Sequence, residues 1–341
     1  MAAPARQNRV TRRKTVIFCV LLAAGLLLAV VIMSLVGSEP LPVRASLCAL
    51  ASLGNTPCGL TRDQFDILFQ IRVPRILLAA AVGGSLATAG AGYQALLRNP
   101  LAEPYLLGIS NGAAVGTMTA LVFFGAVEWT RPVLAFAGAL LATLAVYRLA
   151  HGRAGSTPER LILAGVIVTT FLSSVIIFVT TLMDATRIRS FTFWLLGDLS
   201  GTSKALLPVA ITIAIVGALI LTLNARSLNL LMLGERDAFD LGVEVGRVRV
   251  VVFVVASLLV GSSVAASGSV GYVGLVVPHL ARLSLGSDNR ISIPAAALGG
   301  AVFVIVADTI ARTIIAPREL PVGAITALIG APLFIYLLKK A

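Results

Sequence analysis

Charged side chains are scarce in this chain of 341 residues, because Asp, Glu, Lys and Arg together make up only 12% of it. Soluble domains typically carry about 25%. This shortage excludes a soluble domain of useful size, and a hydrophobic share of 58% indicates an integral membrane protein. The net charge of +12 would suit nucleic-acid binding in a soluble protein, but in a membrane protein it indicates basic loops that orient the chain.

Lysine is especially rare, and no lysine in the chain follows a glycine. A phosphate-binding loop ends in Gly-Lys-Ser or Gly-Lys-Thr, because its lysine contacts the bound phosphates. The chain therefore cannot build such a loop by itself. If ATP drives its activity, ATP and Mg²⁺ bind to a separate ATPase subunit, and we expect no cofactor on this chain.

Histidine and cysteine are also few, with two and three copies, and their positions fit no metal-ligand spacing. We therefore expect no metal site, and any metal that passes through the protein has to travel inside a chelate. Cys19 falls within the first apolar run. Cys48 and Cys58 share one predicted external loop, where an oxidising compartment favours a disulfide, but two free thiols fit the sequence as well.

Ten apolar runs have about the length that a membrane-spanning helix needs, which is roughly 20 residues. The first run follows a basic segment, so we expect residues 1–15 on the cytoplasmic side and, after ten crossings, a cytoplasmic C-terminus. The eighth run is short for a span. The predicted spans are 16–36, 73–97, 105–125, 131–149, 160–182, 206–224, 248–267, 271–285, 294–315 and 321–338.

Three segments lie outside the predicted spans. Residues 37–72 form a predicted external loop. Residues 187–204 are amphipathic and aromatic but too short to cross, which favours an external helix in the membrane interface. Residues 225–247 mix charged and apolar residues around Gly234 and Gly242, which predicts short helices on the cytoplasmic side. These helices dock a cytoplasmic partner or fold onto their own protein; we favour docking.

Two polar segments rich in Pro and Gly, residues 98–113 and 271–290, lie directly against apolar runs. Irregular backbone cannot face lipid, so such breaks lie at a membrane face or line a cavity within the protein. The first contains Gly108-Ile-Ser-Asn-Gly112, which matches the Gly-x-Ser-x-Gly motif of serine hydrolases and leaves an intramembrane hydrolase as an alternative. The other interpretation is that Ser110 helps to start a helix.

Acidic residues, which ion-coupled carriers usually place near the membrane midplane, are nearly absent from the predicted spans, where Asp308 is the main candidate. This disfavours an ion-coupled secondary carrier but leaves it as an alternative. Asp308 stands four residues before Arg312, so the two side chains share one helix face. They form a structural ion pair, or Asp308 is the site that couples transport to an ion. Arg72, Arg75 and Arg312 lie near the external ends of spans, where positive charge is unusual. They meet acidic residues of a soluble partner or reach lipid phosphates.

Seven blocks of this sequence occur in the order found in one family of membrane transporters. They run from Arg72 to Leu338, and a typical first helix precedes them. The chain resembles the permease subunits of bacterial ABC importers for ferric siderophores, cobalamin and haem, the FecCD/BtuC-like family. The blocks are RVPR, GYQALLRNPLAEPYLLGISNGA, LILAGV, GERDAFDLGV, GYVGLVVPHLAR, ADTIAR and ELPVGAITALIGAPLFIYLL.

The resemblance implies an all-α permease, a single transmembrane domain over residues 1–341 with about ten transmembrane helices. It implies a multi-pass protein of the bacterial inner membrane with both termini cytoplasmic, and a homodimer with its transport pathway on the two-fold axis. Two cytoplasmic ATPase subunits and a periplasmic substrate-binding protein complete the expected assembly, with membrane lipid around it and no nucleic acid. Such a subunit is not an enzyme. The chelate stays open between a ferric siderophore, cobalamin and haem, and a passive channel remains a further alternative.

The resemblance also assigns roles to residues. The gate at the cytoplasmic end of the pathway falls on Asn99 and Leu101 and on the turn at Thr157 and Pro158, although this chain has Thr-Pro-Glu where the family has a run of Ser and Thr. The residues that match those docking the binding protein are Arg72, Arg75 and Arg312. The residues that match those engaging the ATPase are Leu233, Gly234, Glu235, Arg236, Asp237, Phe239, Leu241 and Gly242.

Overall fold

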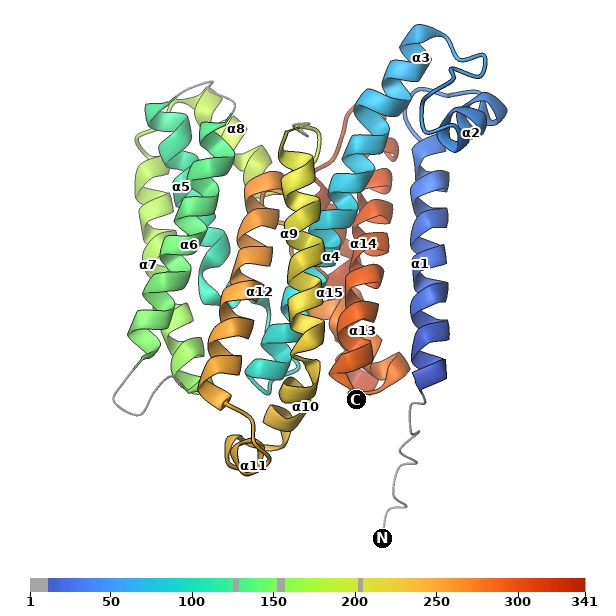
Figure 1. The fold of residues 1–341 in the computed structure, drawn as a ribbon. Helices are drawn as coiled ribbons and strands as arrows, with labels where there is room; N and C mark the ends of the chain where they lie inside the picture. The colour runs from blue at the N-terminus through green and yellow to red at the C-terminus, as the bar shows by residue number, and fades with distance from the viewer. Residues whose placement is uncertain (1–11, 125–128, 152–156, 202–204, 341) are drawn as a thin grey trace.

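The computed structural model describes residues 12–124, 129–151, 157–201 and 205–340, and within these ranges the chain forms helices and turns without a strand (Figure 1). Two of the elements are not α-helical: η1 is π-helical and η2 is a single 3-10 turn. The elements are α1 (Arg12–Leu35), α2 (Val43–Ala51), α3 (Arg62–Asp66), η1 (Ile67–Arg72), α4 (Val73–Leu96), η2 (Pro104–Leu107), α5 (Ile109–Phe123), α6 (Thr130–Ala150), α7 (Pro158–Thr180), α8 (Ala185–Leu195), α9 (Leu206–Leu223), α10 (Ala225–Leu233), α11 (Glu235–Asp240), α12 (Val245–Ser267), α13 (Val273–Leu285), α14 (Asn289–Thr313) and α15 (Val322–Lys340).

Each of the ten predicted spans coincides with a helix. Among the described residues, six helices are long and apolar enough to cross a membrane, and shorter apolar helices cover residues 109–123, 273–285 and 322–337. The all-helical membrane fold is therefore confirmed. The run predicted to be short is α13, which has only 13 residues because the chain before it is a turn. The helices that match the spans are α1, α4, α5, α6, α7, α9, α12, α13, α14 and α15.

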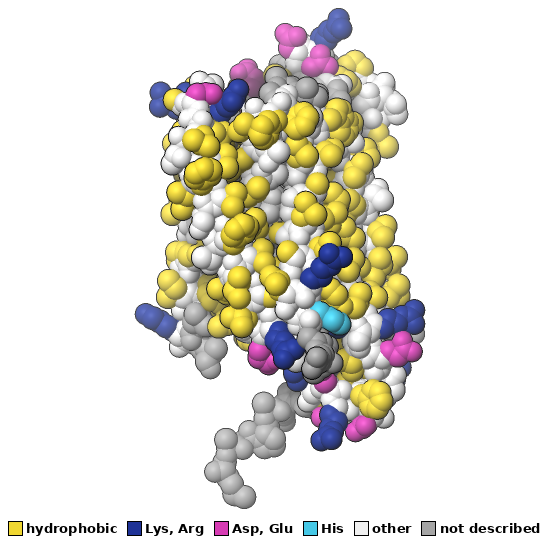
Figure 2. Space-filling view, turned by 90° about the vertical axis from the view of Figure 1, so that its left-hand side faces the viewer, with side chains coloured by type: hydrophobic (Ala, Val, Ile, Leu, Met, Phe, Trp, Pro, Cys, Tyr) yellow, Lys and Arg dark blue, Asp and Glu magenta, His cyan; other side chains and the backbone are white. Residues whose placement is uncertain are grey.

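The bundle has two unlike ends (Figure 1). The α2 end carries α2, α3 and α8, and the α11 end carries α10 and α11. α1 begins and α15 ends at the α11 end, as an even number of crossings requires. Figure 2 shows that hydrophobic side chains cover the middle of one flank of the bundle, while most of its charged side chains gather toward the two ends. This distribution suits a protein surrounded by lipid.

The helix α4 forms the centre of the bundle and packs against α14, α12, α9 and α13. Nearly all its residues are buried, and many of them are Gly or Ala. Helices in lipid associate through close packing, which small residues allow. A Cβ atom added at Gly83 would lie 2.1 Å from the carbonyl oxygen of Gly300, and one at Gly90 would lie 1.9 Å from that of Gly274. Larger residues at these positions would force α14 or α13 away.

The predicted external loop, residues 37–72, folds into α2, α3 and η1 at the α2 end. Cys48 and Cys58 form a disulfide, which settles the alternative that the sequence left open. A capping box starts α3, because Thr61 and Gln64 each accept a hydrogen bond from the other's backbone N–H. The segment also has its own small hydrophobic cluster, formed by Leu41, Ala49, Leu60 and Leu68.

The predicted amphipathic segment, residues 187–204, contains α8, which begins two residues earlier at Ala185 and ends at Leu195. Asp184 caps its start, since the carboxylate accepts a hydrogen bond from the backbone N–H of Arg187 at 2.9 Å. Phe191 and Trp194 are buried against the bundle. The helix is therefore amphipathic, as predicted, and residues 202–204 of the predicted segment lie outside the described residues.

Candidate functional site

The two polar segments singled out in the sequence contact each other inside the bundle. The backbone N–H of Tyr272 donates to Oε1 of Glu103 at 3.2 Å. The hydroxyl of Tyr105 donates to the carbonyl of Val270 and accepts from its N–H, both at 3.0 Å. Polar backbone at membrane depth needs partners from the protein, because lipid provides none. Each break therefore provides hydrogen bonds that the other requires.

Ser110, the serine of the hydrolase-like motif, lies in the first turn of α5 after Gly108, whose φ is +75°. Its hydroxyl donates to the hydroxyl of Ser269 at 3.2 Å. His151 follows the end of α6, and His279 packs edge-on against Phe334. A serine nucleophile needs an adjacent general base, and the contacts of the described residues give Ser110 none. The geometry fits the interpretation that Ser110 helps to start a helix.

The first predicted gate turn, at Asn99 and Leu101, lies at the α11 end just after α4. The side-chain oxygen of Asn99 accepts a hydrogen bond from the backbone N–H of Leu101 at 2.9 Å, and the Asn99 carbonyl accepts from Ala102 at 3.1 Å. Such Asx turns stabilise a tight change of chain direction. Leu101 projects from the turn and is exposed, whereas Ala102 is buried. An exposed leucine on a stiff turn suits a gate, and this role remains a prediction.

The second predicted gate turn precedes α7. The hydroxyl of Thr157 accepts a hydrogen bond from the backbone N–H of Arg160 at 3.4 Å, and Pro158 occupies the first helical position. The next residue, Glu159, is exposed and interacts electrostatically with Arg98 beside the first turn. The two predicted gate turns thus lie near each other, although residues 152–156 fall outside the described residues.

Residues 225–247, which are predicted to dock a cytoplasmic partner and which we call the coupling segment, contain two short helices, α10 and α11, joined at Gly234 with φ +144°. Gly242, with φ +82°, follows α11. One face of the pair folds onto the bundle through Leu228, Leu231 and Ala238, which are buried. The other face is apolar but open, because the exposed fractions of Leu233, Phe239 and Leu241 are 68%, 71% and 62%. Arg236 and Asp237 are exposed beside them.

A polar contact that the sequence did not predict holds α10 against α14. The side-chain nitrogen of Asn229 donates to Oδ1 of Asp288 at 2.7 Å, and its side-chain oxygen accepts from the backbone N–H of Asn289 at 2.9 Å. Hydrogen bonds from Arg290 hold the pKa of the Asp288 carboxyl below its usual range, so the carboxyl stays ionised and remains an acceptor. The coupling segment is therefore fixed to the transmembrane helices on its inner face.

Arg75 forms a buried ion pair at the α2 end. Its guanidinium donates three hydrogen bonds of 2.8–3.1 Å to the carboxylate of Asp308, and another at 2.8 Å to Glu319. Arg312 lies 3.8 Å from the same Asp308 carboxylate, so the predicted pair on one helix face is present. Asp308 is fully buried. The structural interpretation of Asp308 is supported, and the main partner is Arg75, which the helix spacing did not indicate.

Arg72 and Arg312 bind the end of α1. Arg72 donates to the carbonyls of Ser34 and Leu35 at 3.3 and 3.2 Å and also to that of Glu39, while Arg312 donates to the carbonyl of Met33 at 2.8 Å. The last carbonyls of a helix lack partners within the helix and attract cations. These two arginines therefore hold α1 on the bundle.

The resemblance predicts that Arg72, Arg75 and Arg312 dock a binding protein. In the structure all three residues are buried, at 3%, 7% and 6% exposure, and their hydrogen bonds go to the protein itself. The docking role stays a prediction, and it would require partner carboxylates to displace these internal contacts.

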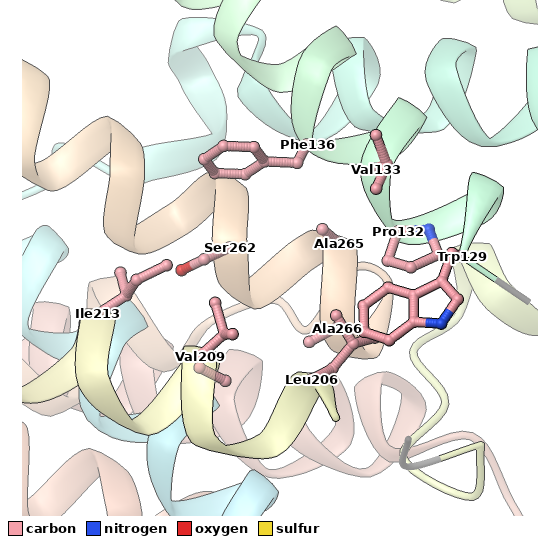
Figure 3. Close-up of a pocket in the computed structure, with 11 residues that line it drawn as sticks. Trp129, Pro132, Val133, Phe136, Leu206, Val209, Ile213, Ser262, Ala265 and Ala266 are labelled. Atoms are coloured by element: carbon pink, nitrogen blue, oxygen red, sulfur yellow. The ribbon is translucent and has the colours of Figure 1, made fainter. Parts of the chain in front are cut away.

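An apolar pocket of about 280 Å³ opens between α6, α9 and α12 (Figure 3). Trp129 lies at one edge, and Ser262 contributes a hydroxyl to walls that are otherwise apolar or aromatic. Sites for drug-sized ligands usually measure about 300–1,000 Å³ and contain several polar groups. This pocket is therefore slightly smaller than a usual ligand site and offers few polar groups to a ligand. Among the described residues, no three His, Cys, Asp or Glu side chains are grouped to hold a metal ion.

Comparison with known proteins gives consistent matches along the whole chain. The model of the FecCD transport family matches residues 13–340. The cobalamin import system permease protein BtuC of Halobacterium salinarum is 42% identical over 281 residues, which cover 82% of this chain and 75% of that protein. The hemin transport system permease protein HmuU of Yersinia pestis is 38% identical over 325 residues, covering 94% and 96%.

A solved structure agrees in fold. It shows the inward-facing conformation of a transporter assigned to the metal-chelate ABC type. Its TM-score with this chain is 0.84 at 30% sequence identity, and the alignment covers 95% of this chain and 99% of that one.

Proposed function

The chain belongs to the FecCD transport family and is a permease subunit of an ABC transporter, and from this premise we propose that it imports a metal chelate. Cobalamin, haem and ferric siderophores are the candidate chelates. The proposed assembly is a homodimer with two cytoplasmic ATPase subunits and a periplasmic binding protein. The chain itself binds no cofactor and hydrolyses no ATP.

The observation that carries this proposal is the open apolar surface of the coupling segment. Leu233 of α10, Phe239 of α11 and Leu241 directly after α11 are exposed, while Leu228, Leu231 and Ala238 of the same segment are buried. Exposed apolar groups rimmed by charge mark surfaces for protein partners. This chain has no phosphate-binding loop. If ATP drives its activity, it needs such a surface to bind a separate ATPase subunit.

The orientation follows from chemistry at the two ends. The Cys48–Cys58 disulfide lies in the α2–α3 segment, and disulfides persist in oxidising compartments. We therefore place the α2 end on the external side and the α11 end, with the start of α1 and the end of α15, in the cytoplasm of a bacterial inner membrane. The binding protein then meets the α2 end and the ATPase meets α10 and α11.

In the proposed mechanism, ATP binding on the partner subunits shifts the dimer between outward-open and inward-open arrangements. Asn99 and Leu101, together with Thr157 and Pro158, close the cytoplasmic end of the pathway. Selectivity belongs to the binding protein.

The relatives support the choice of substrate class, since their names refer to cobalamin and haemin import. Both molecules are metal chelates. The ferric siderophores remain candidates through the resemblance of the sequence blocks.

The proposal is tested by a mild-detergent pull-down of the tagged chain from native membranes. We expect a stoichiometric soluble subunit that contains a phosphate-binding loop, and ATP-dependent uptake of cobalamin, haemin or a ferric siderophore by the reconstituted complex with its binding protein. Recovery of the chain alone in several detergents, with ATP analogues present, would contradict the proposal. Uptake by the purified chain without any ATPase would favour an ion-coupled carrier or a channel.

A further inference from the structure

Four charged side chains from four separate parts of the chain converge at the α11 end. Oε1 of Glu235 accepts a hydrogen bond from Nη2 of Arg249 at 2.5 Å and lies 3.8 Å from Nη2 of Arg98. Among the described residues, Glu159 forms no direct ion pair with either arginine; its carboxyl is held chiefly by hydrogen bonds from its own backbone and from Thr157, and the charges of Arg98 and Arg249 add a smaller effect. We call these residues, Arg98, Glu159, Glu235 and Arg249, the junction cluster. Two carboxylates and two guanidinium groups balance its charge.

The junction cluster joins the two predicted gate turns to the coupling segment. Arg98 directly precedes Asn99, and Glu159 directly follows Pro158. Glu235 is the first residue of α11, immediately after the joint at Gly234. Arg249 lies in the second turn of α12, which crosses the bundle. Hence a shift of α11 about Gly234 displaces the carboxylate that both arginines contact.

We propose that Glu235 is a positioning residue that links the coupling segment to the gate turn through Arg98 and to α12 through Arg249. Movement that an ATPase imposes on α11 then reaches Asn99 and Leu101 through one carboxylate. This inference rests on the proposed function, because it requires an ATPase that moves α11.

The backbone around the cluster supports this role. Arg98 has φ +50°, a left-handed conformation that few residues other than Gly adopt. Its N–H donates to the carbonyl of Ala95 at 3.3 Å, and the N–H of Asn99 donates to that of Gln94 at 3.1 Å. Arg98 therefore extends from a hydrogen-bonded turn at the end of α4. Because Asn99 is the next residue, displacement of the Arg98 side chain would move the gate turn.

Exposure distinguishes a movable link from a structural one. The side chains of Arg98 and Glu235 are 37% and 39% exposed. Ion pairs of this exposure add little to stability, because water screens them. They can break and re-form as α11 moves, and their loss should alter communication between the sites more than folding. The pair of Arg247 and Glu244 is a suitable control, since it lies nearby but joins residues of one short stretch.

The test uses the complete complex of permease, ATPase and binding protein in proteoliposomes. A cysteine replaces the exposed gate residue, Leu101→Cys, and its labelling by a membrane-impermeant maleimide is timed with and without ATP and vanadate. In this parent we expect nucleotide to change the labelling rate by about fivefold or more, as is typical of coupled sites. In the Glu235→Gln and Arg98→Gln variants of the parent we expect this change to be lost. In Arg98→Gln, which alters no residue of the predicted ATPase surface, the ATPase should still co-purify in the same ratio and hydrolyse ATP.

Two further variants separate coupling from general damage. Arg98→Lys should keep the nucleotide effect that Arg98→Gln loses, because lysine retains the charge. Glu244→Gln should keep the full effect. A Glu235→Gln complex that responds to nucleotide as the parent does would overturn the inference. Loss of ATPase binding in Glu235→Gln would overturn it too, because Glu235 would then be a docking residue. Absence of any ATPase from the parent complex would instead refute the proposed function.

Discussion

At the α2 end, Arg75 and Asp308 are buried and joined by three hydrogen bonds, whereas at the α11 end Arg98 and Glu235 are more than a third exposed and 3.8 Å apart. Breaking a buried ion pair leaves an uncompensated charge and costs about 3–5 kcal/mol. An exposed pair is worth about 0–1 kcal/mol. The comparison indicates that the first network holds the helices together, while the second is weak enough to rearrange during a transport cycle.

The largest effect should follow from breaking the buried network. Replacing Asp308→Ala leaves Arg75 and Arg312 buried without their carboxylate, and we expect a loss of about 3–5 kcal/mol in the free energy of unfolding. Thermal unfolding of the purified protein in one detergent measures it. Glu244→Ala, which removes an exposed pair with Arg247, is the matched control. Equal losses in the two variants would contradict the contrast between the ends.

The α2 end is also stabilised by the disulfide, and Cys48→Ser removes it. A bond that closes so short a loop should contribute about 2–3 kcal/mol, mostly by restricting the unfolded segment. We expect faster proteolysis between α2 and α3 with little change at the α11 end. Cys19→Ser, at the free cysteine, is the control. Undiminished resistance of the Cys48→Ser protein to protease would show that the small hydrophobic cluster suffices.

At the α11 end, an apolar side chain should matter for binding and not for folding. Phe239→Ala removes one exposed aromatic group of the coupling segment. We expect a loss of about 1–2 kcal/mol in affinity for the ATPase, as for an aromatic residue important to an interface, with an unchanged unfolding temperature. Phe123→Ala is the control, because Phe123 is equally exposed but ends α5. Titration of labelled ATPase against the two variants decides; identical affinities would argue against this docking surface.

The smallest effect on stability should come from the junction cluster. Glu235→Gln is expected to change the free energy of unfolding by less than about 1 kcal/mol. The side chains of Glu235 and Arg98 are 39% and 37% exposed, and a glutamine oxygen can still accept the hydrogen bond of Arg249, whose side chain is 12% exposed. Thermal unfolding in the same detergent measures it beside Asp308→Ala. A loss as large as that of Asp308→Ala would mean that the α11 end is held together in the same way as the α2 end.

Much of the architecture could be predicted from local sequence. The spans followed from the length of the apolar runs, and α8 followed from a short amphipathic pattern. The glycines at 234 and 242 indicated the joints of the coupling segment correctly. Local sequence patterns could not predict contacts between residues far apart in the chain. Arg75 lies 233 positions from Asp308, and no helical or strand spacing relates two positions so far apart. For the same reason the sequence did not reveal that Arg72, Arg75 and Arg312, which are predicted to dock a binding protein, are buried.

The sequence by itself determined that this chain is a helical membrane protein without a phosphate-binding loop, and its ordered blocks indicated the family. Those properties depend on the transfer of apolar runs into lipid and on residues adjacent in the chain. The tertiary structure decided which polar groups are paired. It brought Glu103 to Tyr272, Arg75 to Asp308, and Glu235 to both Arg98 and Arg249. Such pairs form because helix packing brings polar groups from distant parts of the chain together, where lipid offers them no other partner.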